Sequence, residues 1–287
     1  MLVTGGAGSM GRLVTARLRA AGAAVRVFDL PAVDYSGLEG EEGIEVARGD
    51  LTNPGDVRAA AGGVAAVVHL AAILPPLAQS NPDLARKVNV EGTRVLLEAA
   101  EGAAPDGRFV FSSSVSVYGD TSPQGADVTV ERSVRPDEIY AETKAESEQL
   151  VRESSVPWVV LRISGVAVPV FQEPPAEWPF TADERIEFVH RDDAVAALVA
   201  AVSAPGAARQ VYNISGGPTW RMTGGKYVAD YFELVEADIA DAVYQAVPGH
   251  FDWYDSAAGQ AVLGYQNTPY PDYLAQIQAD IERMLAG

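Results

Sequence analysis

The chain opens with MLVTGGAGSMG, residues 1–11, an apolar run followed by glycines spaced as G-x-x-G-x-x-G at Gly5, Gly8 and Gly11. Glycines there allow a tight turn, let backbone N–H groups approach a pyrophosphate at a helix N-terminus, and let that helix pack close to the preceding strand. Ser9 and Met10 begin the helix. The stretch therefore predicts a strand, a phosphate-binding loop and a helix, with all five residues contacting a dinucleotide.

A second apolar run, AAVRVFDL, ends near Asp29, 18 residues beyond Gly11, where a carboxylate would accept hydrogen bonds from the adenosine ribose. An acid at this position repels a 2′-phosphate and favours NAD over NADP, although Arg26 and Arg48 are near in sequence. After the third apolar run, Asp50 could accept a hydrogen bond from the adenine amino group. It could equally cap the helix that opens at Pro54.

Continuous apolar runs alternate with alanine-rich helical stretches over the first two-thirds of the chain. Continuous runs indicate burial on both faces, and the alternation indicates parallel pairing with right-handed crossovers. We expect strands at residues 1–4, 23–30, 44–51, 64–72, 108–114 and 158–164, and helices at residues 11–21, 54–61, 81–100 and 136–153. The fold class is therefore α/β, a doubly wound parallel (Rossmann) sheet.

Beyond residue 164 the pattern changes to a proline-rich passage, a strand IEFVH at residues 186–190, a helix at 192–202 and a strand VYNIS at 211–215. Helices at residues 227–237 and 270–285 end the chain. We predict a dinucleotide-binding domain of residues 1–163 and 186–214. Residues 164–185 and 215–287 would form a small C-terminal substrate-binding lobe.

Composition limits the possible partners and compartments. A formal charge of −18 repels phosphate backbones and anionic lipid, so neither nucleic acid nor a membrane is expected as a partner. The chain has no cysteine, no stretch typical of a signal peptide, and no apolar run long enough to span a bilayer. We expect a cytoplasmic protein. Its three histidines are scattered and match no metal-binding spacing, so no metal is expected.

Serines replace apolar residues at the end of the fifth strand, in FSSSVSVYGD at residues 111–120. Parallel strands of such a sheet point their carboxyl ends into the ligand crevice, so Ser112 and Ser114 are aimed at a ligand. Downstream, YAETK places Tyr140 and Lys144 at i and i+4 on one helix face. These hydroxyl, phenol and ammonium groups are candidates for one site.

The chain resembles the extended short-chain dehydrogenase/reductases, specifically the NAD-dependent epimerase/dehydratase family typified by sugar-nucleotide epimerases. The matching motifs cover about the first 215 residues in family order: TGGAGSMG, Asp29, GDLTNP, HLAA, NPDLARKVNVEGT, FSSSVSVYGD, YAETK, FVHRDD and VYNIS. The resemblance implies a catalytic triad of Ser114, Tyr140 and Lys144, with Asn89 in the supporting helix near the cofactor. It also implies further NAD contacts at Asp50, Leu51, Leu70, Ala71, Ala72 and Ser112.

The chemistry of these side chains fits that role. A secondary alcohol releases its hydride to a nicotinamide only if the O–H proton also leaves, so a base must lie beside the oxygen. The unperturbed pKa of tyrosine, about 10, is too high at neutral pH. The Lys144 ammonium and the positive nicotinamide ring would favour the phenolate of Tyr140, and Ser114 would hold the substrate oxygen.

Departures from the family pattern bear on the reaction. The 4,6-dehydratases of the family carry an Asp-Glu pair before Val-Tyr-Gly, where this chain has Val115 and Ser116, so elimination is not expected. The segment LRISGVAVP has Ser164 and lacks the asparagine that touches the diphosphate in epimerases, and 15 residues separate Pro169 from Arg185. The candidate substrate contacts are Ser114, Ser116, Ser164 and Arg185. The arginines at 162, 185, 191 and 221 could bind an anionic group or form ion pairs.

We therefore expect an NAD-dependent oxidoreductase or epimerase that reversibly oxidises a secondary hydroxyl of a sugar-like or sugar-nucleotide substrate. One alternative is an NAD(P)-dependent dehydrogenase or ketoreductase of a smaller, non-nucleotide substrate. Another, from a different class, is a non-catalytic NAD(P)-sensing regulator, although such proteins typically lose the Tyr-Lys pair. The resemblance also implies a homodimer, and the small Ala141 and Ala145 would permit close packing of the tyrosine-bearing helix.

Overall fold

A seven-stranded parallel sheet forms the centre of the computed structural model, which describes residues 1–104, 106–121 and 125–286. The strand order is β10-β6-β5-β4-β1-β2-β3, as expected for a doubly wound sheet. The order reverses between β1 and β4, and ligands bind such sheets at this point, beyond the carboxyl ends of the strands. The strands are β1 (Leu2–Thr4), β2 (Val25–Asp29), β3 (Ile44–Arg48), β4 (Ala66–His69), β5 (Arg108–Ser114), β6 (Trp158–Ile163) and β10 (Gln210–Ile214).

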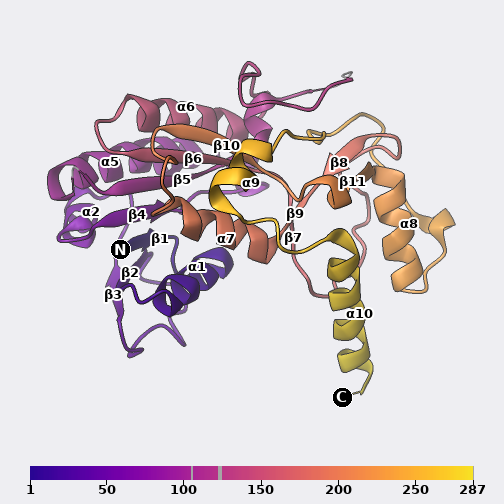
Figure 1. Cartoon of the computed structure of the whole chain (residues 1–287), viewed down its shortest axis with the longest axis horizontal. Coiled ribbons are helices and arrows are strands. Elements are labelled where there is room, and N and C mark those ends of the chain that lie inside the picture. Colours follow the sequence, from indigo (N-terminus) through magenta and orange to yellow (C-terminus); the bar gives the residue numbers. More distant parts are fainter. Residues whose placement is uncertain (105, 122–124, 287) are drawn as a thin grey trace.

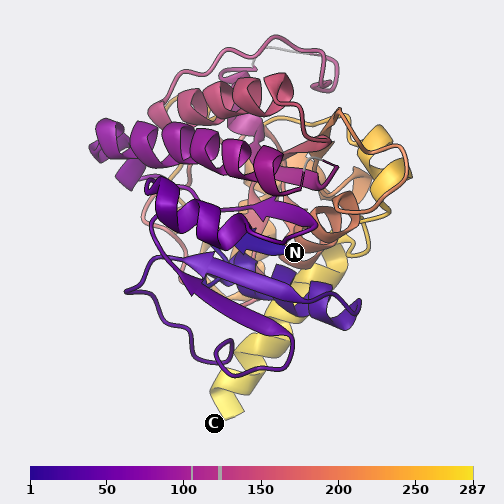
Figure 2. The same ribbon diagram turned by 90° about the vertical axis from the view of Figure 1, so that its left-hand side faces the viewer.

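Helices cover both faces of this sheet (Figures 1 and 2). On one face lie α2 (Pro54–Ala61), α5 (Gly92–Ala103) and α6 (Ile139–Glu153), and on the other lie α1 (Ser9–Ala20) and α7 (Arg191–Ala201). Alternate strand residues enter the two cores: Leu2 packs with the α2–α5 side, whereas its neighbour Val3 packs with the α1–α7 side. Burial on both faces explains why the strands are continuously apolar.

The structure corrects two expected elements. The single helix expected at 81–100 is instead α4 (Pro82–Ala85), the π-helical segment η1 (Arg86–Glu91) and α5, preceded by α3 (Leu77–Ser80). The expected strand IEFVH divides into β8 (Arg185–Glu187) and β9 (Val189–His190) because these two pieces pair with different partners. Between them, the Phe188 ring packs against Tyr227 and Phe251.

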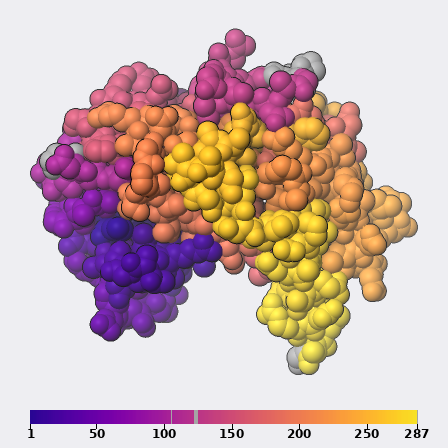
Figure 3. Space-filling view, in the orientation of Figure 1, coloured from indigo at the N-terminus to yellow at the C-terminus, as the bar shows by residue number. Residues whose placement is uncertain are grey.

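The remaining elements build the smaller part of the molecule, at the right of Figure 1. β7 (Val166–Ala167) pairs with β9, and β8 pairs antiparallel with β11 (Arg221–Thr223). α8 (Gly224–Leu234) and α10 (Tyr270–Ala286) pack around an aromatic core that includes Trp178 and Trp220. Figure 3 shows the end of α10, in yellow, projecting from the body and separated by a notch from the indigo N-terminal residues. Short segments complete the chain: η2 (Val115–Tyr118), η3 (Pro218–Trp220), η4 (Ile239–Asp241) and α9 (Ala257–Leu263).

The exact boundary between the sheet domain and the small lobe remains a prediction. β8 lies at this boundary and pairs with β11 rather than with the seven-stranded sheet. α9 comes from the C-terminal segment but contacts β10 and α7. Of the helices within the described ranges, none combines the length and apolar character needed to cross a bilayer.

Candidate active site

The glycine loop connects β1 to α1 in a turn that has no room for side chains at two positions. Gly5 has a φ of +65°, and a Cβ there would lie 2.9 Å from the Ala71 backbone nitrogen. A Cβ on Gly11 would lie 2.2 Å from the Gly5 carbonyl oxygen. The first turn of α1 contains no acidic side chain. The loop thus leaves a helix N-terminus open toward the switch point of the sheet, as anion binding requires.

Asp29 ends β2 beside this loop. Its Oδ2 accepts a hydrogen bond from the Ala7 N–H at 3.1 Å, and its Oδ1 accepts one from the Leu30 N–H at 2.9 Å. The two nearby arginines are engaged elsewhere, since Arg48 pairs with Glu39 at 3.0 Å and Arg26 with Glu45 at 2.9 Å. Their ion-pair partners are thus Glu39 and Glu45 rather than Asp29.

The capping role considered for Asp50 is wrong. Asn53 caps α2 instead, with its Oδ1 accepting from the Gly55 N–H at 2.9 Å. Asp50 accepts hydrogen bonds from the Thr52 N–H at 2.8 Å and from the Thr52 hydroxyl at 2.9 Å. Its exposed carboxyl lines the cleft described next, and its contact with adenine stays a prediction.

A cleft of about 600 Å³ runs from the glycine loop to the ends of β5 and β6. The predicted site residues that line it are Gly5, Gly8, Ser9, Met10, Gly11, Asp29, Asp50, Leu51, Leu70, Ala71, Ala72, Ser112, Ser114, Tyr140, Lys144 and Ser164. Side chains that the sequence did not single out also contribute, among them Leu30, Val33, Ile73 and Leu74. These follow strand ends, which is the one sequence signal that could have indicated them.

Three predicted residues are not part of this lining: Asn89, Ser116 and Arg185. Asn89 is buried in η1 and holds the backbone of Ile73, accepting from its N–H at 2.7 Å and donating to its carbonyl at 3.0 Å. It also donates to the Thr143 hydroxyl at 2.9 Å, which connects the end of β4 to α6. Asn89 therefore lies outside the cleft and holds Ile73, which lines the cleft, against α6.

Ser114, Tyr140 and Lys144 meet at the β5 end of the cleft. Lys144 is 3% exposed, and its Nζ donates to the Ser112 carbonyl at 2.8 Å. The same nitrogen lies 5.7 Å from the centroid of the Tyr140 ring. The Ser114 hydroxyl accepts from the Ser116 N–H at 3.1 Å and is hydrogen-bonded to the Tyr140 phenol. Strand β5 and helix α6 thus bring together the three groups expected from the sequence.

Burial dominates the electrostatics of these groups. It raises the pKa of Tyr140 above its usual value, Glu138 adds to this effect, and the hydrogen bond with Ser114 opposes it. Burial lowers the pKa of Lys144 to about 8, against an opposing influence of the Glu148 carboxylate one helical turn away. A lysine with that pKa remains mostly protonated at neutral pH, so a positive charge lies beside the phenol.

A buried ion pair lies beside β5 and was not foreseen as a pair. The side chains of Arg162 and Glu148 are 2% and 4% exposed and meet at 2.7 Å. The Ser113 hydroxyl donates to Glu148 at 2.5 Å, and Arg162 also donates to the Tyr118 hydroxyl at 3.0 Å. A lone arginine within the apolar strand WVVLRIS was the available signal.

Each arginine considered for an anionic substrate group is in an ion pair instead. Arg162 pairs with Glu148, Arg185 with Asp127 and Asp252, Arg191 with Asp192, and Arg221 with Asp127 and Glu187. By contrast, the buried hydroxyls of Ser116 and Ser164 have no hydrogen-bond partner among the described residues. Ser164 is therefore the predicted substrate contact with an unused hydrogen-bonding group in the cleft.

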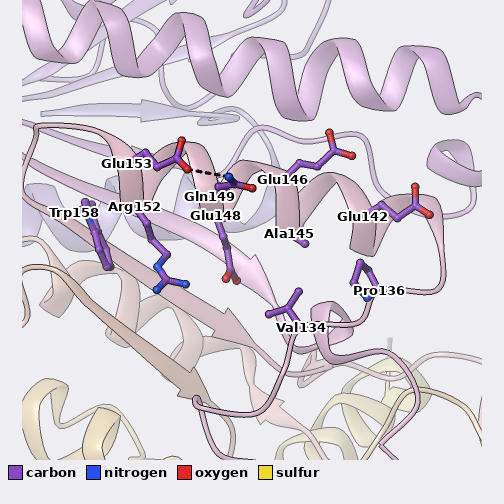
Figure 4. Close-up of a pocket in the computed structure, with 10 residues that line it drawn as sticks. All are labelled: Val134, Pro136, Glu142, Ala145, Glu146, Glu148, Gln149, Arg152, Glu153 and Trp158. Carbon is purple, nitrogen blue, oxygen red and sulfur yellow. Dashed lines mark hydrogen bonds between the residues drawn. The ribbon is translucent and has the colours of Figure 1, made fainter.

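A second concavity, of about 730 Å³, follows α6 (Figure 4). Its lining is rich in carboxylates, and the figure shows Glu142 and Glu146 directed away from the strands while Glu148 points toward them. None of the predicted cofactor, catalytic or substrate residues line it. The groups with catalytic potential therefore lie in the first cleft.

A family model and several known proteins match parts of this chain. The model of the NAD-dependent epimerase/dehydratase family matches residues 1–175. D-erythronate dehydrogenase of Cupriavidus necator is 33% identical over 181 residues, covering 58% of this chain and 55% of that protein. A 3 beta-hydroxysteroid dehydrogenase/Delta 5-->4-isomerase of Mycobacterium tuberculosis is 36% identical over 158 residues, covering 53% and 41%. The chain thus spans about half the length of the curated relatives it matches.

A solved short-chain dehydrogenase/reductase superfamily protein of Agrobacterium tumefaciens, with bound NAD, is similar over 99% of this chain and 98% of its own, with a TM-score of 0.84 and 26% identity. A UDP-glucose 4-epimerase of Thermotoga maritima shares the fold over 99% of both chains, with a TM-score of 0.82 and 21% identity.

Proposed function

The chain belongs to the NAD-dependent epimerase/dehydratase family, and on this basis we propose that it reversibly oxidises a secondary hydroxyl, with Tyr140 as the acid/base. Its cofactor is NAD. The observation that carries the proposal is the meeting of Ser114, Tyr140 and Lys144 at one end of a cleft whose other end is the glycine loop. That arrangement puts a proton acceptor, Tyr140, in the same cleft that would hold the hydride acceptor.

The residues of the cleft fit this cofactor. The crowded turn at Gly5 and Gly11 leaves the N-terminus of α1 accessible to a pyrophosphate, and the Asp29 carboxylate suits ribose hydroxyls while repelling a 2′-phosphate. Lys144, by resemblance to the family, would hold the nicotinamide ribose. When bound, NAD supplies the hydride acceptor.

The roles of the three side chains follow from their chemistry. Ser114 donates a hydrogen bond to the substrate oxygen and fixes its position. Tyr140 takes the hydroxyl proton as the C–H bond breaks and returns a proton in the reverse direction. Burial and the nearby Glu138 both raise the pKa of Tyr140 and so disfavour its phenolate. The reaction therefore depends on the adjacent positive charges of Lys144 and of the oxidised nicotinamide.

Two versions of this chemistry follow from the family. In one, the cleft would keep its NAD bound throughout, so that the hydride taken from the substrate would be returned to it, and the chain would be an epimerase of a sugar-like or sugar-nucleotide substrate. In the other, the cofactor exchanges, which yields a dehydrogenase of a smaller substrate. The ion pairing of Arg162, Arg185 and Arg221 supports the second version. Two relatives that are dehydrogenases by name also support it.

The proposal is tested by incubating the chain and NAD⁺ with secondary alcohols that carry deuterium on the carbinol carbon. Deuterium in the released NADH would establish direct hydride transfer. Cofactor retained at about one equivalent after purification would favour the epimerase version, and reversible binding would favour the dehydrogenase. Tight NAD binding without turnover of any alcohol or ketone would contradict the proposal and indicate a non-catalytic regulator.

We also propose a cytoplasmic homodimer that packs through α6. Ala145 of this helix lines the concavity in Figure 4, whereas Ala141 is fully buried within the chain and is not available to a partner. Light scattering of the purified chain tests the dimer, and a monomer mass across the micromolar range would rule it out.

A further inference from the structure

An aromatic pocket of about 240 Å³ lies in the small lobe and adjoins the catalytic cleft. Val166 lines both cavities. Of the two residues before it, Ser164 lines the cleft and Gly165 lines the pocket. The cleft and the pocket therefore share a wall residue at the start of β7.

Aromatic rings form much of the pocket wall. Phe188 meets Phe251 at a centroid distance of 5.4 Å and Tyr227 at 5.1 Å, both edge to face, and Trp178 packs edge-on against Tyr231 at 5.9 Å. Interlocking pairs of this kind give a fixed apolar surface. Val166 and Val170, which also line the pocket, are 39% and 38% exposed. Apolar side chains thus remain uncovered at this surface.

The tyrosine hydroxyls of the pocket are already engaged within the protein. The Tyr227 and Tyr273 hydroxyls are 3.3 Å apart and bond to each other. The Tyr231 hydroxyl donates to the Gln172 carbonyl and accepts from the Gln172 N–H at 3.1 Å. These rings therefore offer a ligand their apolar faces and edges rather than free donors.

The charges around the pocket disfavour an anion. Of the described residues that line it, the one that carries a charge is Glu173, an exposed acid. The cations of residues 164–185 and 215–286 are all paired: Arg185 and Arg221 as above, Lys226 with Asp230, and Arg283 with Asp280. A diphosphate would have to break one of these pairs to gain a cationic partner from this lobe.

We infer that this pocket binds an uncharged apolar group of the substrate, attached close to the carbinol carbon that reacts at Tyr140. The inference rests on the proposed function and adds the substrate class: a secondary alcohol or ketone with a hydrocarbon arm, rather than a nucleoside diphosphate sugar. An apolar cavity of about 150 Å³ accepts benzene, so the arm would contain about six to ten carbon atoms.

The first experiment measures kcat/KM for NAD⁺-dependent oxidation of 2-alkanols from 2-butanol to 2-decanol. We expect an increase of about fourfold per methylene until the pocket is full. In Val170→Trp, whose new ring would occupy the pocket mouth, the rate with 2-butanol should persist and the increase with length should disappear. Val247→Trp, at a 66% exposed valine of the same lobe that is outside the pocket lining, is the matched control and should behave like the parent. An increase that survives in Val170→Trp would overturn the inference.

The second experiment separates this inference from the proposed function by measuring binding without chemistry. Calorimetry with naphthalene and the NAD-loaded chain should detect binding that Val170→Trp abolishes and Val247→Trp retains. Naphthalene binding without alcohol turnover would contradict the proposed function and support the pocket assignment. Turnover without naphthalene binding would remove the pocket assignment alone. UDP and UDP-glucose should not compete with the alcohol. Inhibition by UDP that is competitive with the alcohol would contradict the inference that the substrate is uncharged.

Discussion

Replacing Glu148 with glutamine would leave the Arg162 guanidinium buried without its counter-charge. The two side chains are 2% and 4% exposed and share contacts at 2.7 Å and 3.0 Å. Breaking one partner of such a pair typically costs about 3–5 kcal/mol, because the remaining charge stays desolvated. The same change removes the carboxylate that raises the pKa of Lys144, so that pKa should fall below about 8 and turnover should drop as well.

Urea unfolding followed by tryptophan fluorescence measures the loss in the free energy of unfolding. With an m-value of about 3 kcal/mol/M, the midpoint of Glu148→Gln should fall by about 1–1.7 M. The double variant Glu148→Leu with Arg162→Met removes both charges and should regain most of the loss. Glu146→Gln breaks an exposed pair on the same helix and should cost about 1 kcal/mol or less. A loss below about 1 kcal/mol in Glu148→Gln would refute the view that this pair is desolvated.

Three further predictions concern the cofactor cleft and its surroundings. Gly11→Ala, whose Cβ would lie 2.2 Å from a carbonyl oxygen, should weaken NAD binding about tenfold or more by calorimetry, and unchanged affinity would contradict the crowding of the loop. Asp29→Ala should raise kcat/KM with NADP⁺ relative to NAD⁺ by about tenfold, and an unaltered ratio would count against the ribose contact. Burial and the nearby Lys144 lower the pKa of His69 to about 3, so its contribution to stability is present above the unfolded pKa of about 6.5 and is lost as pH falls. Between pH 7 and 5 the free energy of unfolding, measured in urea, should therefore fall by roughly 2 kcal/mol more in the parent than in His69→Asn. Equal decreases would show that His69 takes up its proton in the folded state.

The sheet and the residues that line the cleft could be predicted from sequence because both depend largely on local patterns. The continuous apolar runs predicted the strands of the sheet. α2 spans Pro54–Ala61, as expected. Residues at strand ends share one edge of a parallel sheet, so Asp29 and Ser114 could be placed together from the strand pattern, whereas Tyr140, on α6, was placed with Ser114 by the resemblance to the family.

Features that depend on tertiary contacts were missed. Nothing in the stretch around Glu148 indicates that its carboxylate turns inward to Arg162 on another element. The division of IEFVH into β8 and β9 depends on pairing with β11 and β7, and Arg185 is engaged by acids of two other segments. The π-helical turn at Asn89 likewise accompanies contacts with Ile73 and Thr143.

Turnover by Tyr140→Phe tests the central claim most directly, once an alcohol substrate has been found. This change removes one hydroxyl oxygen, so NADH affinity should stay within about threefold while kcat falls by about 10²- to 10⁴-fold. Tyr212→Phe, at a buried tyrosine of β10 outside the cleft lining, should retain both values. Turnover of Tyr140→Phe close to that of the parent, with NADH still bound, would contradict the assignment of Tyr140 as the acid/base.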